Sequence, residues 1–168
     1  ELFMRWIQAA AFQPFFRNHG SAGTNHREPW MWSEKALNIS RDAIKKRYQF
    51  LPMWYTLFYE HEVSGIPVMR PMLSQYPRDK NVLEIETQFM LADKLLVSPV
   101  LERGATWVLV YFPSTDGASG YDLWYDIDTY KKYDTLGRVP IEAKIEKSPV
   151  FQRGGTIIPK KLEARSSS

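Results

Sequence analysis

The stretch Gly65-Ile66-Pro67-Val68-Met69-Arg70-Pro71 separates two parts of the chain that differ in sequence pattern. Before it, apolar residues recur at the three- and four-residue spacing of amphipathic helices. After it, short runs rich in β-branched and aromatic residues alternate with turn signals, which is typical of strands. Gly65 suits the position just after a helix, where a left-handed backbone is favoured. We therefore predict two domains, residues 1–65 and residues 66–168.

The first part predicts two helical segments with a strand between them. Residues 1–12 place their apolar side chains on one helical face, and Pro14 forbids the helix to continue. Residues 15–19, Phe-Phe-Arg-Asn-His, are expected to form a short buried strand, followed by a polar loop. A long helix is expected over residues 33–64, kinked where Pro52 interrupts its hydrogen bonding.

The second part predicts an antiparallel β-sandwich. Its strand-like runs are short and closely spaced, as in all-β domains. We expect strands over residues 66–71, 95–101, 106–112, 121–127, 141–145 and 151–159, with a turn at Gly154-Gly155.

Composition excludes several classes of protein. Of the 168 residues, 44% are hydrophobic, so most of the chain is expected to fold. No cysteine is present, which excludes disulfides and thiolate chemistry. The net charge of +3 is small, and the basic residues of the chain are scattered along it. Nucleic acid is therefore not a favoured partner. No apolar run is long enough to span a membrane. The length is too short for a complete (β/α)8 barrel of about 250 residues. Since the chain starts at Glu1 on a helical pattern, we expect it to be a piece of a larger protein.

Polar residues at the end of the predicted strand are candidates for ligand binding. Arg17 and His19 would present donors to hydroxyl or carboxylate groups, at the strand end where α/β folds bind ligands. Spacing alone leaves open a hydrogen-bonded, purely structural histidine. Trp30 and Trp32 could cover the apolar face of a sugar, or pack at a domain junction.

Other titratable residues lack the spacing that metal or acid–base chemistry needs. His26 and His61 have no second ligand at a suitable distance in sequence. The acidic residues Asp122, Asp126 and Asp128 lack the glycine and terminal glutamate of a calcium loop. No pair of carboxylates suits the acid and nucleophile roles of a glycosidase.

Several motifs occur together and in a fixed order. Residues 2–19 carry Leu2-x-x-Arg5-Trp6-x-x-x-Ala10-Ala11-Phe12-x-Pro14-Phe15-x-Arg17-Asn18-His19, which resembles the second signature of glycoside hydrolase family 31. The agreement continues through Arg27-Glu28-Pro29-Trp30, the stretch at Gly65, and Pro149-Val150-Phe151-Gln152-Arg153-Gly154-Gly155-Thr156-Ile157. The resemblance implies an α/β plus all-β fold: the C-terminal fragment of a (β/α)8 barrel followed by an antiparallel β-sandwich.

The same resemblance implies an activity and a division of roles. The family hydrolyses α-glucosides with retention, using an aspartate nucleophile and an aspartate acid/base. Both would lie upstream of Glu1, so this chain would hold no catalytic residue and be inactive alone. His19 would bind a glucose hydroxyl, with Arg17 and Trp30 also at the substrate site. No cofactor and no metal are implied.

Within the family, the motifs are most similar to members that trim N-glycans in the lumen of the endoplasmic reticulum. This implies hydrolysis of α-1,3-linked glucose on a glucose-containing oligosaccharide, and a non-catalytic β subunit as partner. The alternative is a carbohydrate-binding sandwich that uses Trp107, Trp124 and neighbouring tyrosines as a platform. A third interpretation is a sandwich that only braces the barrel.

Overall fold

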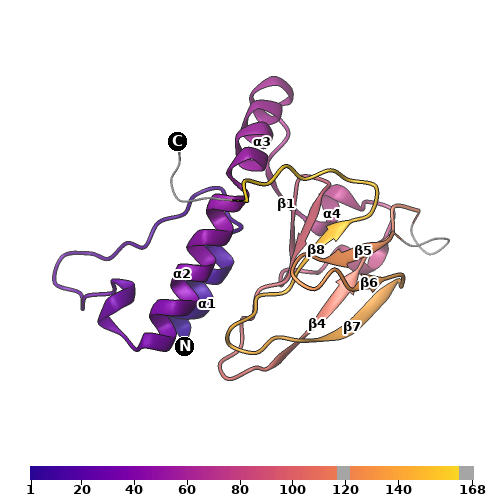
Figure 1. Ribbon diagram of the computed structural model, residues 1–168. Helices are drawn as coiled ribbons and strands as arrows, with labels where there is room; N and C mark the ends of the chain where they lie inside the picture. The colour runs from indigo at the N-terminus through magenta and orange to yellow at the C-terminus, as the bar shows by residue number, and fades with distance from the viewer. Residues whose placement is uncertain (117–121, 163–168) are drawn as a thin grey trace.

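The computed structural model describes residues 1–116 and 122–162 (Figure 1). The helices that precede Gly65 lie beside the layered strands that follow it. The helical elements of the first part are α1 (Leu2–Ala10), η1 (Pro29–Met31), α2 (Glu34–Gln49) and α3 (Leu51–Ser64). The second part contains β1 (Met69–Pro71), α4 (Met72–Gln75), η2 (Lys80–Val82), β2 (Phe89–Leu91), β3 (Leu95–Val97), β4 (Trp107–Phe112), β5 (Trp124–Asp126), β6 (Lys132–Tyr133), β7 (Gly137–Glu142) and β8 (Val150–Arg153).

The strands form two antiparallel sheets. The larger sheet has the order β1-β2-β3-β8-β5-β6, and β4 pairs with β7 in the smaller one. Side chains of both sheets meet in one core, where the ring of Phe112 lies 4.9 Å from that of Phe151 at 81°. Edge-to-face packing of this kind stabilises aromatic cores. The predicted antiparallel sandwich is therefore confirmed.

The central strands of the larger sheet are buried on both faces. Met90 and Leu96 point into the sandwich core, whereas Phe89, Leu91 and Leu95 point to a second core shared with the helices. Because successive side chains of a strand face opposite ways, each face of β2 and β3 is covered by a different layer. The helices thus sit directly on the sheet, through α1, α2 and α3.

The predicted kinked helix is confirmed as two helices, α2 and α3, that meet at Phe50. Pro52 occupies the first turn of α3, where a missing N–H costs nothing. Ser33 caps α2 by accepting a hydrogen bond from the Ala36 N–H at 3.2 Å. Gly65 ends α3 with a φ of 72°, a conformation that glycine adopts without strain.

The strand predicted over residues 15–19 is wrong. That segment is irregular, and Phe15 is 74% exposed. A strand needs a neighbour to satisfy its main-chain groups, and none of the described strands lies beside this segment. The other predicted strands occur with shifted bounds: residues 66–71 keep only β1, and the strand predicted at 141–145 begins earlier, as β7. The strand predicted from residue 121 starts outside the described residues.

Candidate functional site

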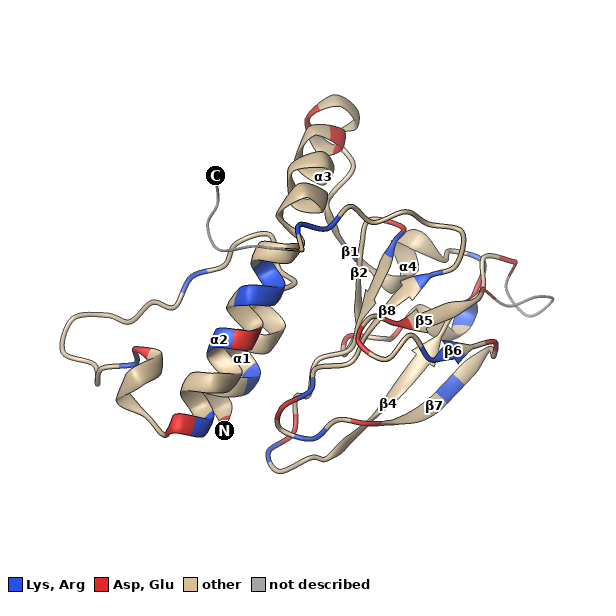
Figure 2. Ribbon diagram, in the orientation of Figure 1, with Lys and Arg blue, Asp and Glu red and all other residues tan. Residues whose placement is uncertain are grey.

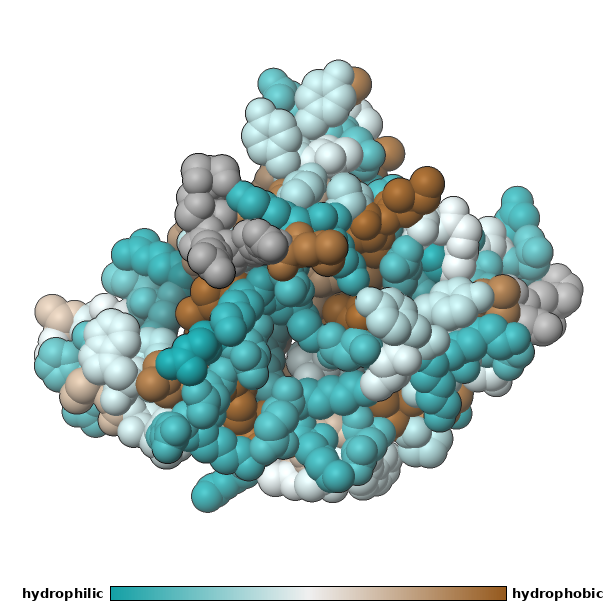
Figure 3. Space-filling model, in the orientation of Figure 1, coloured by the Kyte–Doolittle hydropathy of each residue, from teal (hydrophilic) through white to brown (hydrophobic). Residues whose placement is uncertain are grey.

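A cleft of about 790 Å³ opens between α1, the irregular segment and the loop that leads to α2. It brings together the three residues that the sequence singled out, Arg17, His19 and Trp30. Its further lining comes from Leu2, Phe3, Trp6, Ile7, Ala10, Phe16, Asn18, Asn25, His26, Arg27, Pro29, Trp32 and Ile44. The cleft thus has one polar end and one apolar wall. Hydrophobic patches also interrupt the hydrophilic surface in the view of Figure 3.

The polar end is organised by two arginines. Arg17 Nη2 lies 3.0 Å from His19 Nδ1, and Arg27 Nη1 donates to the His19 carbonyl at 3.1 Å. Asn18 Nδ2 donates back to the Arg27 carbonyl at 2.7 Å. Arg27 was not identified as a site residue from the sequence, although it lies within a quoted motif. These contacts fix the segment and the loop to each other.

The contact with Arg17 determines the tautomer of His19. A guanidinium has only donors, so Nδ1 of His19 must be the acceptor. In this arrangement the ring N–H is on Nε2. A neutral imidazole with an Nε2–H can donate one hydrogen bond to a hydroxyl of a ligand. Arg17 therefore orients His19 as a hydrogen-bond donor.

Trp32 and Trp30, which both lie on the apolar wall, have different roles. Trp32 stacks on Phe3 of α1, with ring centroids 5.8 Å apart and 25° between the planes. It therefore packs the loop onto the helix within residues 1–65, and not at the junction of the two predicted domains. Trp30 is 69% exposed and Trp6 is 62% exposed, so both rings present apolar area to the cleft. Flat exposed rings of this kind suit the C–H faces of sugars.

Acidic groups are missing from this lining. Among the described residues that line the cleft, none is Asp or Glu. Glu28 lies close by, where its Oε1 is 3.4 Å from His26 Nδ1. Its own backbone N–H and the His26 ring hold the pKa of Glu28 below its usual range, so it is a carboxylate at neutral pH. The cleft is built for hydrogen bonding and stacking, and it lacks an acid–base pair.

Comparison with known families decides the membership of the chain. Residues 65–158 match the Glycosyl hydrolase family 31 C-terminal domain, and residues 1–57 match the Glycosyl hydrolases family 31 TIM-barrel domain.

The chain belongs to glycosyl hydrolase family 31.

Its relatives within family 31 are long enzymes. The neutral alpha-glucosidase AB of Dictyostelium discoideum is 45% identical over 168 residues, which cover all of this chain and 17% of that protein. The ER glucosidase II heterodimeric complex of catalytic subunit and regulatory-subunit binding domain is similar with a TM-score of 0.89 and 31% identity. That match covers 98% of this chain and 17% of the other. A glucose complex of the family 31 dextranase of Flavobacterium johnsoniae gives a TM-score of 0.87 and 37% identity, covering 95% and 19%. The chain thus spans less than a fifth of each.

The family 31 barrel fragment and the sandwich are joined through Arg5 on α1, which is 8% exposed. Its guanidinium donates to the main-chain carbonyls of Ala105, Ala143, Lys144 and Lys147 at 2.8–3.2 Å. Buried carbonyls are costly without a donor, so one side chain satisfies several sandwich loops at once. This arrangement favours the bracing interpretation of the sandwich.

The alternative interpretation places a carbohydrate-binding platform of Trp107 and Trp124 on the family 31 sandwich. Only Trp107 is exposed there. Trp124 is fully buried and packs against Tyr76 and Phe112 in the core. Trp107 is 59% exposed, but a platform needs two or more exposed coplanar rings. The prediction that Trp124 shares an exposed platform is wrong, because its strand faces the sandwich core there.

The acidic run on the sandwich is structural. Asp126 is 1% exposed and accepts hydrogen bonds from the N–H groups of Asp128 and Thr129, both at 2.9 Å. Its second oxygen accepts from Lys147 Nζ at 2.7 Å. In residues 1–116 and 122–162, no group of three or more His, Cys, Asp or Glu could hold a metal ion. Asp126 thus stabilises its own turn through backbone hydrogen bonds and an ion pair with Lys147.

Because Asp126 is buried and ion-paired, we expect the free energy of unfolding to depend on pH. Burial alone would raise the pKa of Asp126, but Lys147 and the two amides outweigh it and hold the pKa below the usual range. The ionised group therefore stabilises the fold fully above pH 4 or so, and this contribution is lost as pH falls through the folded-state pKa. We expect Asp126→Asn to lower the melting temperature at pH 7, and this deficit to shrink at pH 3.

Glu142, which forms an exposed ion pair with Lys144, provides the control for that experiment. Glu142→Gln should change the melting temperature little at either pH, because exposed pairs contribute little. A deficit of Asp126→Asn that stays the same from pH 7 to pH 3 would contradict the assigned role of the carboxylate.

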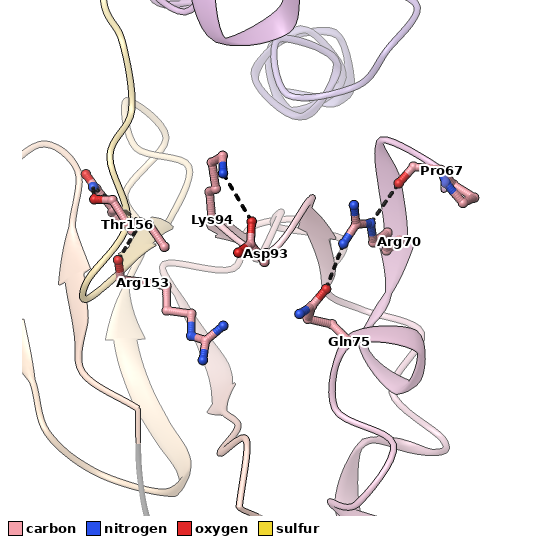
Figure 4. Close-up of polar contacts among 8 residues, drawn as sticks. Pro67, Arg70, Gln75, Asp93, Lys94, Arg153 and Thr156 are labelled. Carbon is pink, nitrogen blue, oxygen red and sulfur yellow. Dashed lines mark hydrogen bonds and ion pairs between the residues drawn. The ribbon is translucent and has the colours of Figure 1, made fainter. Parts of the chain in front are cut away.

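A second polar cluster lies at the end of the β2–β3 hairpin (Figure 4). Arg70 donates to Gln75 Oε1 at 2.9 Å, and Lys94 Nζ lies 3.3 Å from Asp93 Oδ1. Arg153 pairs with Asp122 at 3.2 Å. Since each of these cations already has a partner, the cluster acts as a hydrogen-bonded rim of the sheet. Figure 2 shows the other charges distributed over both parts of the chain.

The remaining histidine identified from the sequence lies away from the cleft. His61, on α3, has its Nδ1 2.9 Å from the Ile66 carbonyl and thereby supports the end of that helix. In the part of the chain that the structure describes, every helix is too short or too polar to span a bilayer.

Proposed function

We propose that this chain supplies one wall of the substrate site of a retaining α-glucosidase that removes terminal α-linked glucose. The observation that carries the proposal is the cleft in which His19, oriented by Arg17, faces the same space as the exposed ring of Trp30. The Nε2–H would donate to a glucose hydroxyl, and the indole would cover an apolar sugar face. Membership of family 31 and the similarity to neutral alpha-glucosidase AB support it.

The chemical step would be supplied from outside this chain. Retention requires two carboxyl groups about 5–5.5 Å apart on either side of the glycosidic bond. The described lining of the cleft holds no carboxylate, so the nucleophile and the acid/base would lie on earlier strands of the barrel. The chain alone would then bind poorly and hydrolyse nothing. Its part is to hold the glucose in register with those groups.

The two predicted domains would have different roles in the substrate site. Residues 1–65 would carry the sugar-binding groups, and residues 66–168 would brace them. The contacts of Arg5 support this division, because they tie the helix that lines the cleft to the loops of the sandwich.

A more specific proposal concerns the sugar linkage of the substrate, the compartment and the partner subunit. We propose α-1,3-linked glucose on N-glycans as the substrate, in the lumen of the endoplasmic reticulum, with a non-catalytic β subunit as partner. The similarity to the ER glucosidase II complex, whose structure contains part of a regulatory subunit, supports this. The likeness to a dextranase makes α-1,6-linked glucose the alternative.

The test uses the full-length protein that contains these residues. It is incubated with an aryl α-glucoside, and the anomer of released glucose is followed by proton NMR. We expect α-glucose first, and faster hydrolysis of an α-1,3-linked than of an α-1,6-linked diglucoside. Release of β-glucose would overturn the retaining mechanism, and the reverse linkage preference would overturn the proposed substrate. Turnover by residues 1–168 alone would overturn the placement of the carboxylates.

A further inference from the structure

Arg47 on α2 is a buried cation that binds only backbone and aromatic rings. It is 9% exposed, and none of the acidic residues in the described chain forms an ion pair with it. Its guanidinium donates to the carbonyls of Ala11 at 3.3 Å, Gln13 at 2.6 Å and Pro14 at 3.2 Å. Burial lowers the pKa of Arg47 to about 10, which leaves it charged at neutral pH.

The three carbonyls belong to the point where the chain leaves α1. Ala11 is the C-cap of α1, and the last carbonyls of a helix lack partners within it and carry its negative partial charge. Gln13 and Pro14 lie in the irregular stretch that follows. A guanidinium has five donors in a rigid planar fork, so it can bind several carbonyls at fixed angles. Lysine has a single nitrogen on a flexible stem and cannot reproduce that fork. Arg47 therefore fixes the direction in which the segment departs.

Aromatic rings hold the guanidinium itself in place. Its central carbon lies 4.0 Å from the ring of Trp54 on α3 and 5.8 Å from that of Phe16. Phe16 lines the cleft and directly precedes Arg17. The segment lacks sheet hydrogen bonds, so its path depends on Arg47 at its start and on Arg27 at its end.

We propose that Arg47 is a positioning residue for the sugar site, acting by holding the segment so that His19 meets the glucose hydroxyl. The inference rests on the proposed function and deepens it. Arg47 is separated from the ligand by Phe16 and the main chain, so it would act only through the residues it positions. A displaced donor would lose most of its hydrogen bond, because such bonds weaken steeply with poor geometry.

The test is a double-mutant cycle in the full-length enzyme. With an aryl α-glucoside, we expect Arg47→Lys to lower kcat/KM by about tenfold, in line with the cost of small misplacements at active sites. In a His19→Ala background the same substitution should change kcat/KM by less than about twofold, since coupled residues are non-additive. A merely structural role would give equal losses in both backgrounds.

Arg70→Lys is the control, because Arg70 also donates to a backbone carbonyl, that of Pro67 at 2.7 Å, but lies in the sandwich part and does not line the cleft. It should leave kcat/KM of the folded enzyme unchanged. If Arg47→Lys does not fold, Trp54→Phe weakens the stacking on the guanidinium, at a cost in core packing around Trp54, and enters the same cycle. Equal kcat/KM for the wild type and the variant, or equal losses in both backgrounds, would overturn the proposal. An inactive wild type would instead overturn the proposed function.

Discussion

Replacing His19 with alanine in the full-length enzyme is expected to lower kcat/KM for an aryl α-glucoside by about 10²-fold. The substitution removes the imidazole that contacts Arg17 and lines the cleft, and with it the proposed donor to a glucose hydroxyl. A sugar hydroxyl left without its partner in a closed site costs about 2–3 kcal/mol, which corresponds to that factor. The measurement is steady-state kinetics of purified variants at one pH.

Two further variants make the His19 result specific. His19→Gln keeps an amide donor and should recover part of the loss. His61→Ala removes a histidine that only supports the end of α3, and it should leave kcat/KM unchanged. Deoxy-glucosides that lack the bound hydroxyl should be hydrolysed equally by wild type and His19→Ala. If every deoxy-glucoside shows the full loss, His19 does not act by donating to a hydroxyl.

Replacing Arg5 with alanine is expected to destabilise the protein by about 3 kcal/mol, because it strips the donor from four carbonyls, one of them in a buried contact. Gln8 would keep only its own bond to the Ile145 carbonyl at 2.8 Å. For a unit of this size the melting temperature should fall by about 6–12 °C in a thermal unfolding experiment.

The control for Arg5 is an arginine of the same helical part with one exposed contact. Arg41 donates to Asn38 Oδ1 at 2.7 Å on the solvent face of α2. Arg41→Ala should shift stability by less than about 0.5 kcal/mol. Similar shifts for the two variants would show that the carbonyl contacts of Arg5 contribute little.

The helices could be predicted from the sequence because their signals are local. Ser33, Pro52 and Gly65 mark a cap, a break and a stop, and each acts within a few residues. Strand β2 was missed because Phe89, Met90 and Leu91 are all apolar, so no alternation marks them. Their periodicity is hidden by burial on both faces of the sheet. The segment at 15–19 failed for the opposite reason, since strands depend on partners distant in sequence.

The site was predictable in part. Arg17, His19 and Trp30 line one cleft, and their binding of a sugar stays a prediction. Arg47 was not identified as a site residue from the sequence, because its partners Ala11 and Gln13 are main-chain groups far away in sequence. A side chain that binds backbone leaves no complementary residue for a sequence reader to find. Burial of a charged residue on an otherwise apolar face is the one signal that could have marked it.

The junction made by Arg5 has a consequence for how the sequence can vary. Arg5 recognises carbonyl oxygens, which every amino acid carries, and no side chain of the 143–147 loop. Substitutions in that loop can therefore accumulate without loss of the contact, provided that its backbone path is kept. Arg5 has no such freedom, because lysine cannot reach four acceptors at once. Tolerance to mutation should be strongly asymmetric across this contact, high on the loop and low at a single helical position.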